Sequence, residues 1–370
     1  MRRAMSLGGP GRVPVMSQMS IGHMLIQTGL PPVEFWYDRD CFGEGLLRLR
    51  ELYDFDGILV SLHGHGNEWS RRIASLRKGE SEDEIRWKDG SRTVFPNDDL
   101  PRHFAAAETA APSIAGFDPE AIPDRLDYIP VSQGLRFVFD PDRRTDIFRD
   151  VLEKAGTRFS VHGEVTSPLD YFLDLFGFAA GFLALADEPD RSKAVLDRFA
   201  DGVVRIAVEQ ALLGLDAIKI SSPYAGAGFI SPRFYRAFVL PYEARIAAAV
   251  REAGAFVYTH TCGAIGDRLE LMAEAGISGL ECLDPPPLGN VELADAKARL
   301  GGRLFIKGNI DPVHTLLQGT IPAVEADVRA RLMAGSPGGG YILSSACSIA
   351  PRTPRTHVQA LARLAAEFLK

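Results

Sequence analysis

A histidine and two cysteines follow two apolar segments of the sequence. His260 and Cys262 come at the end of the run Ala255–Thr259, and Cys347 comes shortly after the run Gly340–Ser344. An isolated His-x-Cys pair also arises by chance, but the carboxyl ends of parallel strands share one face, so Cys347 is expected to join the pair. One imidazole and two thiolates suit Zn²⁺ and leave a coordination position open. The pattern therefore predicts a catalytic zinc site.

The two sulfur ligands indicate what such a zinc would do. Two thiolates donate much electron density, which makes the metal a weak Lewis acid but a good holder of a nucleophilic thiolate or oxygen substrate. The His-Glu-x-x-His motif of many zinc hydrolases is not found in the sequence. The ligand set favours sulfur alkylation over hydrolysis.

Three further titratable residues follow expected strands. Glu164 is a candidate for a fourth zinc ligand or a catalytic group, and equally for a solvated or helix-capping carboxylate. His63 and His65 are candidates for metal ligands or general acid–base groups, or else for hydrogen-bonding residues that shape the pocket. Cys41 and Cys282 are interpreted as core or surface residues.

The elements that position these residues alternate along the chain. From about residue 158, short apolar runs alternate with longer helical patterns such as Pro189–Leu213 and Pro232–Glu252, which is typical of βαβ units and a parallel sheet. The expected strands are Gly57–Leu62, Arg158–His162, Asp216–Ile220, Ala255–Thr259, Gly279–Cys282, Leu304–Lys307 and Gly340–Ser344. An eighth strand is expected near Tyr128–Val131 or Gly134–Phe139.

Eight such strands would close a barrel. Since no Gly-x-Gly-x-x-Gly turn follows the first strand, the alternation favours an α/β fold of the (β/α)8 TIM type over a doubly wound sheet. We expect residues 1–370 to form a single barrel domain, with residues 1–12 flexible. Residues 63–127 are expected to be an insertion after an early strand, over the barrel mouth, with a β-hairpin formed by Glu84–Trp87 and Arg92–Phe95.

Composition narrows the functional classes. The 370 residues are 46% hydrophobic and 24% charged with a net charge of -7, which is ordinary globular composition and argues against nucleic acid as a partner. No apolar run reaches the length of a membrane span, so we expect a soluble cytoplasmic protein without a membrane partner. Four cysteines are too few for a disulfide scaffold, which favours metal binding or catalysis.

Several blocks at characteristic spacing carry a family resemblance. They are Gly214-Leu215-Asp216-Ala217-Ile218, Ile230-Ser231-Pro232-Arg233-Phe234-Tyr235 leading to Pro241-Tyr242, His260-Thr261-Cys262-Gly263, and Lys307-Gly308-Asn309-Ile310-Asp311-Pro312 with Gly319-Thr320. From about residue 50 to its end the chain resembles the uroporphyrinogen decarboxylase superfamily, and within it the corrinoid-dependent methyltransferase branch. The resemblance implies the barrel fold and maps the zinc site of that branch onto His260, Cys262 and Cys347.

The resemblance also implies a reaction and its partners. A methyl group would move between a corrinoid, delivered by a carrier protein or as free cobalamin, and a small substrate. That substrate is either a thiol acceptor such as coenzyme M or a methyl donor such as an aryl methyl ether. The alternative is a metal-free decarboxylase, although His63 and His65 stand where the decarboxylases have a catalytic Asp. A third hypothesis is a corrinoid or tetrapyrrole binder without turnover.

Substrate-binding candidates come from the ends of the expected strands and from the aromatic stretch near the N-terminus. They are Trp36, Tyr37, Ser221, Tyr224, Tyr258 and Asn309.

Overall fold

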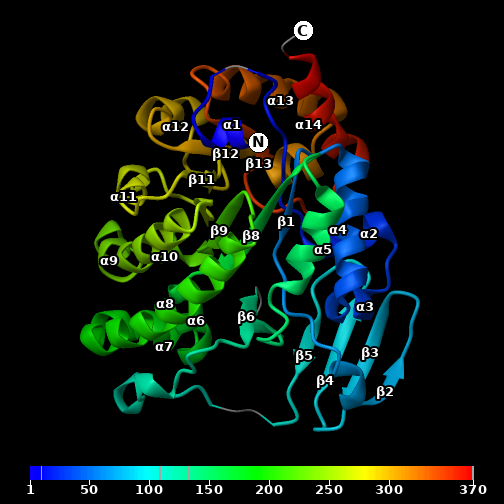
Figure 1. Cartoon of the computed structure of the whole chain (residues 1–370), viewed down its shortest axis with the longest axis vertical. Coiled ribbons are helices and arrows are strands. Elements are labelled where there is room, and N and C mark those ends of the chain that lie inside the picture. Colours follow the sequence, from blue (N-terminus) through cyan, green and yellow to red (C-terminus); the bar gives the residue numbers. More distant parts are fainter. Residues whose placement is uncertain (10, 108–109, 132–133, 369–370) are drawn as a thin grey trace.

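The core of the protein is one curled sheet of seven parallel strands. A computed structural model describes residues 1–9, 11–107, 110–131 and 134–368. The strands are hydrogen-bonded in the order β1 (Gly57–Val60), β8 (Ser160–Thr166), β9 (Ala217–Ser221), β10 (Phe256–Thr261), β11 (Gly279–Cys282), β12 (Phe305–Ile310) and β13 (Tyr341–Ser345). Figure 1 shows helices around the outer face of this sheet, which is the architecture of a TIM-type barrel. The seven strands predicted from the apolar runs are confirmed.

The N-terminal segment lies between the two edge strands of the sheet. The amide of Leu343 donates to the carbonyl of Pro14 at 2.9 Å, and the amide of Asp56 donates to the carbonyl of Val15 at 2.8 Å. Residues 14–16 therefore link β13 to the start of β1 and take the place of an eighth strand.

The prediction of an eighth barrel strand near residues 128–139 is wrong. Tyr128–Val131 (β6) and Leu135–Val138 (β7) pair with each other in a separate antiparallel ribbon. Burial alternates along β7, whereas every residue of β1 is buried. A strand at the centre of a parallel barrel is covered on both faces, so this alternation suits a half-exposed hairpin.

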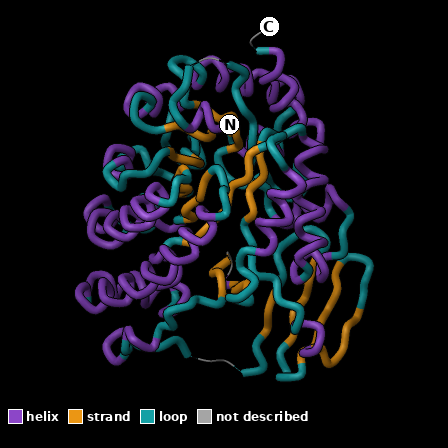
Figure 2. The backbone as a smooth tube through the Cα atoms, in the orientation of Figure 1, coloured by secondary structure: helices purple, strands orange, loops and turns teal. Residues whose placement is uncertain are grey.

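The helices return the chain between the strands (Figure 2). They are α1 (Arg2–Met5), α2 (Ile21–Thr28), α3 (Pro32–Tyr37), α4 (Arg39–Tyr53), α5 (Asp146–Ala155), α6 (Pro168–Phe176), α7 (Phe178–Asp187), α8 (Pro189–Leu212), α9 (Pro232–Phe238), α10 (Leu240–Glu252), α11 (Leu269–Ala273), α12 (Leu293–Leu300), α13 (Ile321–Gly335) and α14 (Arg355–Glu367). Short 3-10 turns occur at Trp69–Arg72, Ile114–Gly116, Pro119–Ala121 and Pro223–Ala225, and Pro312–Leu317 is a π-helix.

Local sequence explains where several helices begin. Ser167 and Ser231 accept a hydrogen bond from the third helical amide of α6 and α9, and a proline follows each serine. The stretch expected as one helix from Pro232 to Glu252 is divided at Val239, because Pro241 lacks the amide needed to continue the helix.

The segment expected to be flexible makes defined contacts. Ala4 and Met5 of α1 are buried in one apolar cluster with residues near the amino ends of the strands, including Ala217 and Phe305. Arg2 pairs with Asp216 at 2.6 Å. Helix α1 therefore covers the amino end of the barrel, because the strand residues there present an apolar layer that Ala4 and Met5 complete.

A second sheet follows β1. Strands β2 (Ile73–Arg77), β3 (Glu82–Trp87), β4 (Arg92–Pro96) and β5 (Arg102–Phe104) form an antiparallel sheet beyond the carboxyl end of β1 (Figure 1), and the hairpin predicted for this region is confirmed as β3 and β4.

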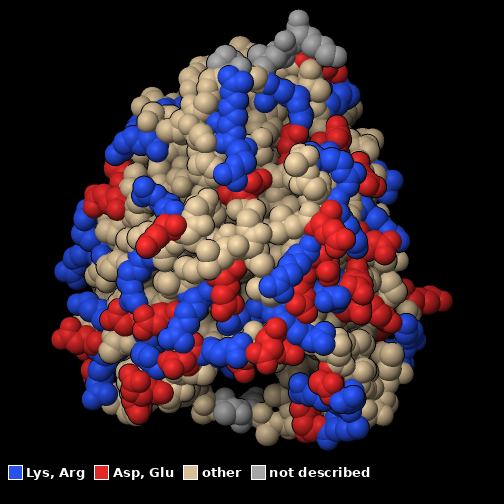
Figure 3. Space-filling view, in the orientation of Figure 1, with Lys and Arg blue, Asp and Glu red and all other residues tan. Residues whose placement is uncertain are grey.

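The surface carries both signs of charge. On the face shown in Figure 3, basic and acidic side chains are interspersed. Within the described ranges no single helix is long and apolar enough to cross a membrane. Helices α6 and α7, which meet at a bend of 110°, together have the length and apolar composition of a membrane span.

Candidate metal centre

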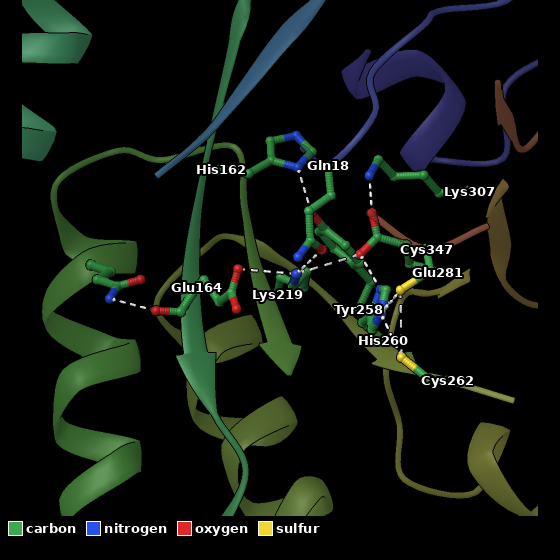
Figure 4. Close-up of polar contacts among 11 residues, drawn as sticks. Gln18, His162, Glu164, Lys219, Tyr258, His260, Cys262, Glu281, Lys307 and Cys347 are labelled. Atoms are coloured by element: carbon green, nitrogen blue, oxygen red, sulfur yellow. Dashed lines mark hydrogen bonds and ion pairs between the residues drawn. The ribbon is translucent and has the colours of Figure 1, made fainter. Parts of the chain in front are cut away.

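One imidazole and three thiols meet at the carboxyl ends of the barrel strands. His260 ends β10, Cys262 follows it, Cys282 ends β11, and Cys347 follows β13; their ligand atoms all lie within 4.8 Å of one another. His260 Nε2 is 3.3 Å from Cys262 Sγ, and Cys262 Sγ is 3.6 Å from Cys347 Sγ (Figure 4). The structure thus brings together the three residues selected from the sequence and adds a fourth.

Backbone geometry explains why Cys262 reaches this place. A Cβ atom at Gly226 would stand 2.5 Å from the carbonyl oxygen of Cys262, so the loop after β9 approaches that carbonyl as only glycine allows. The next residue, Gly263, has φ +75 and donates its amide to the Asp284 carboxylate at 2.7 Å. These contacts turn the chain immediately after Cys262 and hold its side chain towards the other sulfurs.

The donor set fits zinc. Nitrogen and thiolate sulfur are the ligands that Zn²⁺ takes in tetrahedral sites. Hydrogen bonds with Cys262, Cys282 and His260 hold the pKa of Cys347 well below its usual value. Burial lowers the pKa of His260, but the Cys262 charge and hydrogen bonds with both cysteines outweigh it and raise the pKa to about 9. The cluster therefore favours an anionic sulfur, which is the form that binds a metal.

Cys282 is the member that the sequence interpretation missed. The sequence suggests a core or surface residue; Cys282 is fully buried, but its sulfur faces the cluster. Burial, followed by hydrogen bonds with Cys262 and Cys347, raises its thiol pKa well above the usual value. A signal was present, because Cys282 ends the strand next to the His260 strand and the ends of neighbouring parallel strands meet.

Glu164 lies in an ion pair outside the cluster. Its carboxylate is 3.0 Å from Lys219 Nζ, inside the barrel. Among the described residues, Glu164 is not part of the group whose ligand atoms lie within 4.8 Å of one another. In the described part of the chain, Cys282 and not Glu164 lies with the other three potential ligands.

His63 and His65 also lie apart from the cluster. Both are buried among aromatic rings: His63 packs on Phe139 at 4.9 Å between ring centroids, and His65 packs on Phe137 at 5.0 Å. Burial is the main cause that lowers the pKa of each to about 3. Both side chains are therefore neutral near pH 7, which suits packing against the aromatic rings better than donation of a proton.

The low pKa of His63 predicts a measurable pH dependence of stability. The unfolded chain takes up a proton on His63 near pH 6.5 while the folded protein does not, so stability present above pH 6.5 is lost as the pH falls. Between pH 7 and pH 5 this histidine alone should lower the free energy of unfolding by about 2 kcal/mol. Urea unfolding of wild type and His63→Gln at both pH values should show that the variant loses about 2 kcal/mol less.

Comparison with the variant is needed because other buried groups titrate in the opposite sense. Burial raises the pKa of Asp170 to about 8 and that of Glu243 to about 7, so these carboxyls favour the folded state as the pH falls. Their contribution is common to both proteins and cancels. Equal pH dependence in wild type and His63→Gln would contradict the low pKa of His63.

The substrate-binding candidates fall into two groups. Ser221 ends β9 and is half-buried, and the amide of Ser222 donates to the carbonyl of His260 at 2.9 Å. Tyr224 is close enough that the charge of Cys262 adds to burial and to Asp170 in raising its pKa. Ser221 and Tyr224 therefore lie beside the cluster of His260 and the three cysteines.

The other four candidates pack elsewhere. Tyr258 is buried near the amino end of the barrel and contacts Phe305, and Asn309 donates to the carbonyl of Leu283 at 2.8 Å. Trp36 packs against a phenylalanine of β7, and Tyr37 joins aromatic rings of the second sheet. These contacts stabilise the barrel and the second sheet.

The fold and the cluster define a TIM-type barrel with a potential nitrogen–sulfur metal centre at the carboxyl ends of its strands. The chain belongs to the uroporphyrinogen decarboxylase (URO-D) family, whose model matches residues 137–368. The family and fold predicted from the sequence are confirmed.

Curated relatives include two kinds of enzyme. The chain is 28% identical over 218 residues to methylcobamide:CoM methyltransferase MtaA of Methanosarcina barkeri (strain Fusaro), which covers 59% of this chain and 61% of the relative. It is 30% identical over 220 residues to methylcobamide:CoM methyltransferase MtbA of Methanosarcina mazei, and the match covers 58% of this chain and 60% of the relative. It is 32% identical over 182 residues to uroporphyrinogen decarboxylase of Gloeobacter violaceus, covering 46% and 47%. The matches thus span about half to three fifths of these relatives.

Among solved structures, a methyltransferase from Methanosarcina mazei is similar over the whole chain. The TM-score is 0.72 at 20% identity, with coverage of 100% of this chain and 97% of the other. This likeness supports the fold.

Proposed function

We propose that the protein is a zinc-dependent methyltransferase. It would move a methyl group between a corrinoid, carried by a partner protein or free as cobalamin, and a small substrate that is either a thiol acceptor or a methyl donor such as an aryl methyl ether. The observation that carries the proposal is the convergence of His260, Cys262 and Cys347 at the carboxyl ends of the barrel strands. Similarity to methylcobamide:CoM methyltransferases supports it.

Each residue has a role in this proposal. His260, Cys262 and Cys347 hold the zinc, and Cys282 offers a fourth sulfur within reach. When bound, zinc supplies positive charge that keeps a substrate thiol or a leaving oxygen in its anionic form. Ser221 and Tyr224, beside the cluster, orient the substrate.

The sulfur-rich ligand set favours a thiol substrate. Three nearby sulfurs reduce the Lewis acidity that hydrolysis or ether cleavage would need. Ether cleavage without a strong Lewis acid would need a proton donor such as His63 or His65, but burial keeps both histidines neutral near pH 7. Transfer to a thiol is therefore the direction to assay first.

The assay follows the corrinoid spectrum. Zinc-loaded protein is mixed with methylcobalamin and coenzyme M or another small thiol, and loss of the methylcobalamin absorption under anaerobic conditions reports transfer. The reverse direction uses cob(I)alamin with aryl methyl ethers. We expect zinc-dependent turnover in one of these reactions. Turnover that persists after complete zinc removal, or decarboxylation of uroporphyrinogen without any methyl transfer, would contradict the proposal.

A further inference from the structure

Four ionisable side chains, three of them almost fully buried, lie inside the barrel next to His260. Their exposed fractions are 13% for Glu164, 0% for Lys219, 1% for Glu281 and 0% for Lys307. Lys219 Nζ is 3.0 Å from the Glu164 carboxylate and 3.8 Å from that of Glu281, and Lys307 pairs with the other oxygen of Glu281 (Figure 4). An unpaired buried charge raises the free energy of the folded state. Each of these side chains therefore depends on its partners, and the network fixes their positions.

Glu281 connects this network to the metal centre. Its Oε2 atom lies 3.0 Å from Nδ1 of His260, while Nε2 of the same ring faces Cys262 at 3.3 Å and Cys347 at 3.8 Å. A carboxylate that accepts a hydrogen bond from Nδ1–H keeps the proton on Nδ1 and leaves the Nε2 lone pair free for a metal. The strand register places the two residues side by side, because His260 of β10 is paired with Glu281 of β11.

We propose that Glu281 is a positioning residue that fixes the His260 ring for metal binding through Nε2, and that Lys219 and Lys307 hold the Glu281 carboxylate in place. This inference rests on the proposed metal site and adds residues to it. With Lys307 bound to Oε1, the carboxylate cannot turn towards the sulfurs of the cluster without leaving the fully buried Lys307 amine without this hydrogen-bond partner. Its remaining oxygen is thereby kept for the imidazole, which also makes the ring a stronger electron donor to the metal.

The test is the zinc affinity of the purified full-length protein, measured by competition with a chromogenic chelator. Loss of a carboxylate behind a metal-bound histidine weakens binding about 10–100-fold. We expect Glu281→Gln to show a loss of this size. Glu164→Gln is the matched control, because it removes the same charge from the same network without a contact to His260; it should leave zinc affinity within about twofold.

A double-mutant cycle separates positioning from general destabilisation. In His260→Ala, where no ring remains to be oriented, adding Glu281→Gln should weaken zinc binding less than about twofold. Additive losses, or equal losses in Glu281→Gln and Glu164→Gln, would overturn the inference.

Two further outcomes can be distinguished, one with a second variant and one with the wild type. If Glu281→Gln does not fold, Glu281→Gln combined with Lys307→Gln keeps the buried charges balanced and should show the same affinity loss. If wild type itself binds no zinc, the proposed function fails; if wild type binds zinc and Glu281→Gln binds it equally well, only the role of Glu281 fails.

Discussion

Replacing Cys262 or Cys347 with serine should lower the rate of methyl transfer by about a thousandfold or more. A metal that stabilises charge in the transition state contributes several kcal/mol, and about 4 kcal/mol corresponds to a factor of roughly a thousand. Each serine replaces a cysteine of the cluster, in which His260 Nε2 and the sulfurs of Cys262 and Cys347 lie 3.3, 3.6 and 3.8 Å apart. The measurement is the initial rate of methylcobalamin demethylation at saturating thiol.

Cys41→Ser is the matched control for both variants. Cys41 is half-buried on α4 and does not belong to the cluster. The same chemical change there should leave the rate within about twofold. A Cys262→Ser enzyme that retains most of its activity would contradict the assignment of this residue to the metal centre.

Replacing Lys219 with methionine should destabilise the protein by about 3–5 kcal/mol, the usual cost of removing one partner from a buried ion pair. Lys219 is fully buried and is the counter-ion of Glu164 and, at longer distance, of Glu281. Methionine preserves most of the side-chain volume, so the loss is one of charge pairing. Urea unfolding at pH 7 measures the free-energy difference.

Lys193→Met provides the comparison on the surface. Lys193 is 47% exposed and lies 3.7 Å from Asp190, which is 97% exposed. Exposed ion pairs contribute between zero and about 1 kcal/mol, so this variant should unfold almost as wild type does. Similar losses in the two variants would mean that the buried network does not stabilise the fold as its burial indicates.

Much of the cluster of His260 and the cysteines could be predicted because parallel strands end at one face. His260, Cys262 and Cys347 are far apart in the sequence, yet each follows an apolar run, and the fold places such positions together. The same reasoning extends to Cys282, which ends a predicted strand. It was missed because a cysteine within an apolar run has the composition of a core residue.

The charged interior also had a signal in the sequence. Lys219, Glu281 and Lys307 interrupt runs that are otherwise apolar, and a charge inside a buried strand must be paired. Which charges pair depends on the register between strands, and a single sequence does not supply that register.

Other differences come from contacts distant in the sequence. Residues 14–16 are too few to show a strand period, so their place between β13 and β1 could not be predicted. Trp36 and Tyr37 are substrate-binding candidates in the sequence because large aromatic side chains suit binding sites as well as cores. In the structure the ring centroids of Tyr37 and Trp87 lie 5.8 Å apart, so Tyr37 packs against the second sheet.

The metal content of the protein tests the central proposal most directly. Freshly purified protein that has not met a chelator is measured by inductively coupled plasma mass spectrometry, beside the Cys262→Ser and Cys347→Ser variants. We predict about one zinc per chain in wild type, bound at the cluster of four potential ligands found in the described part of the chain, and almost none in either variant. Wild-type protein without zinc, or variants that retain the wild-type amount, would contradict the account.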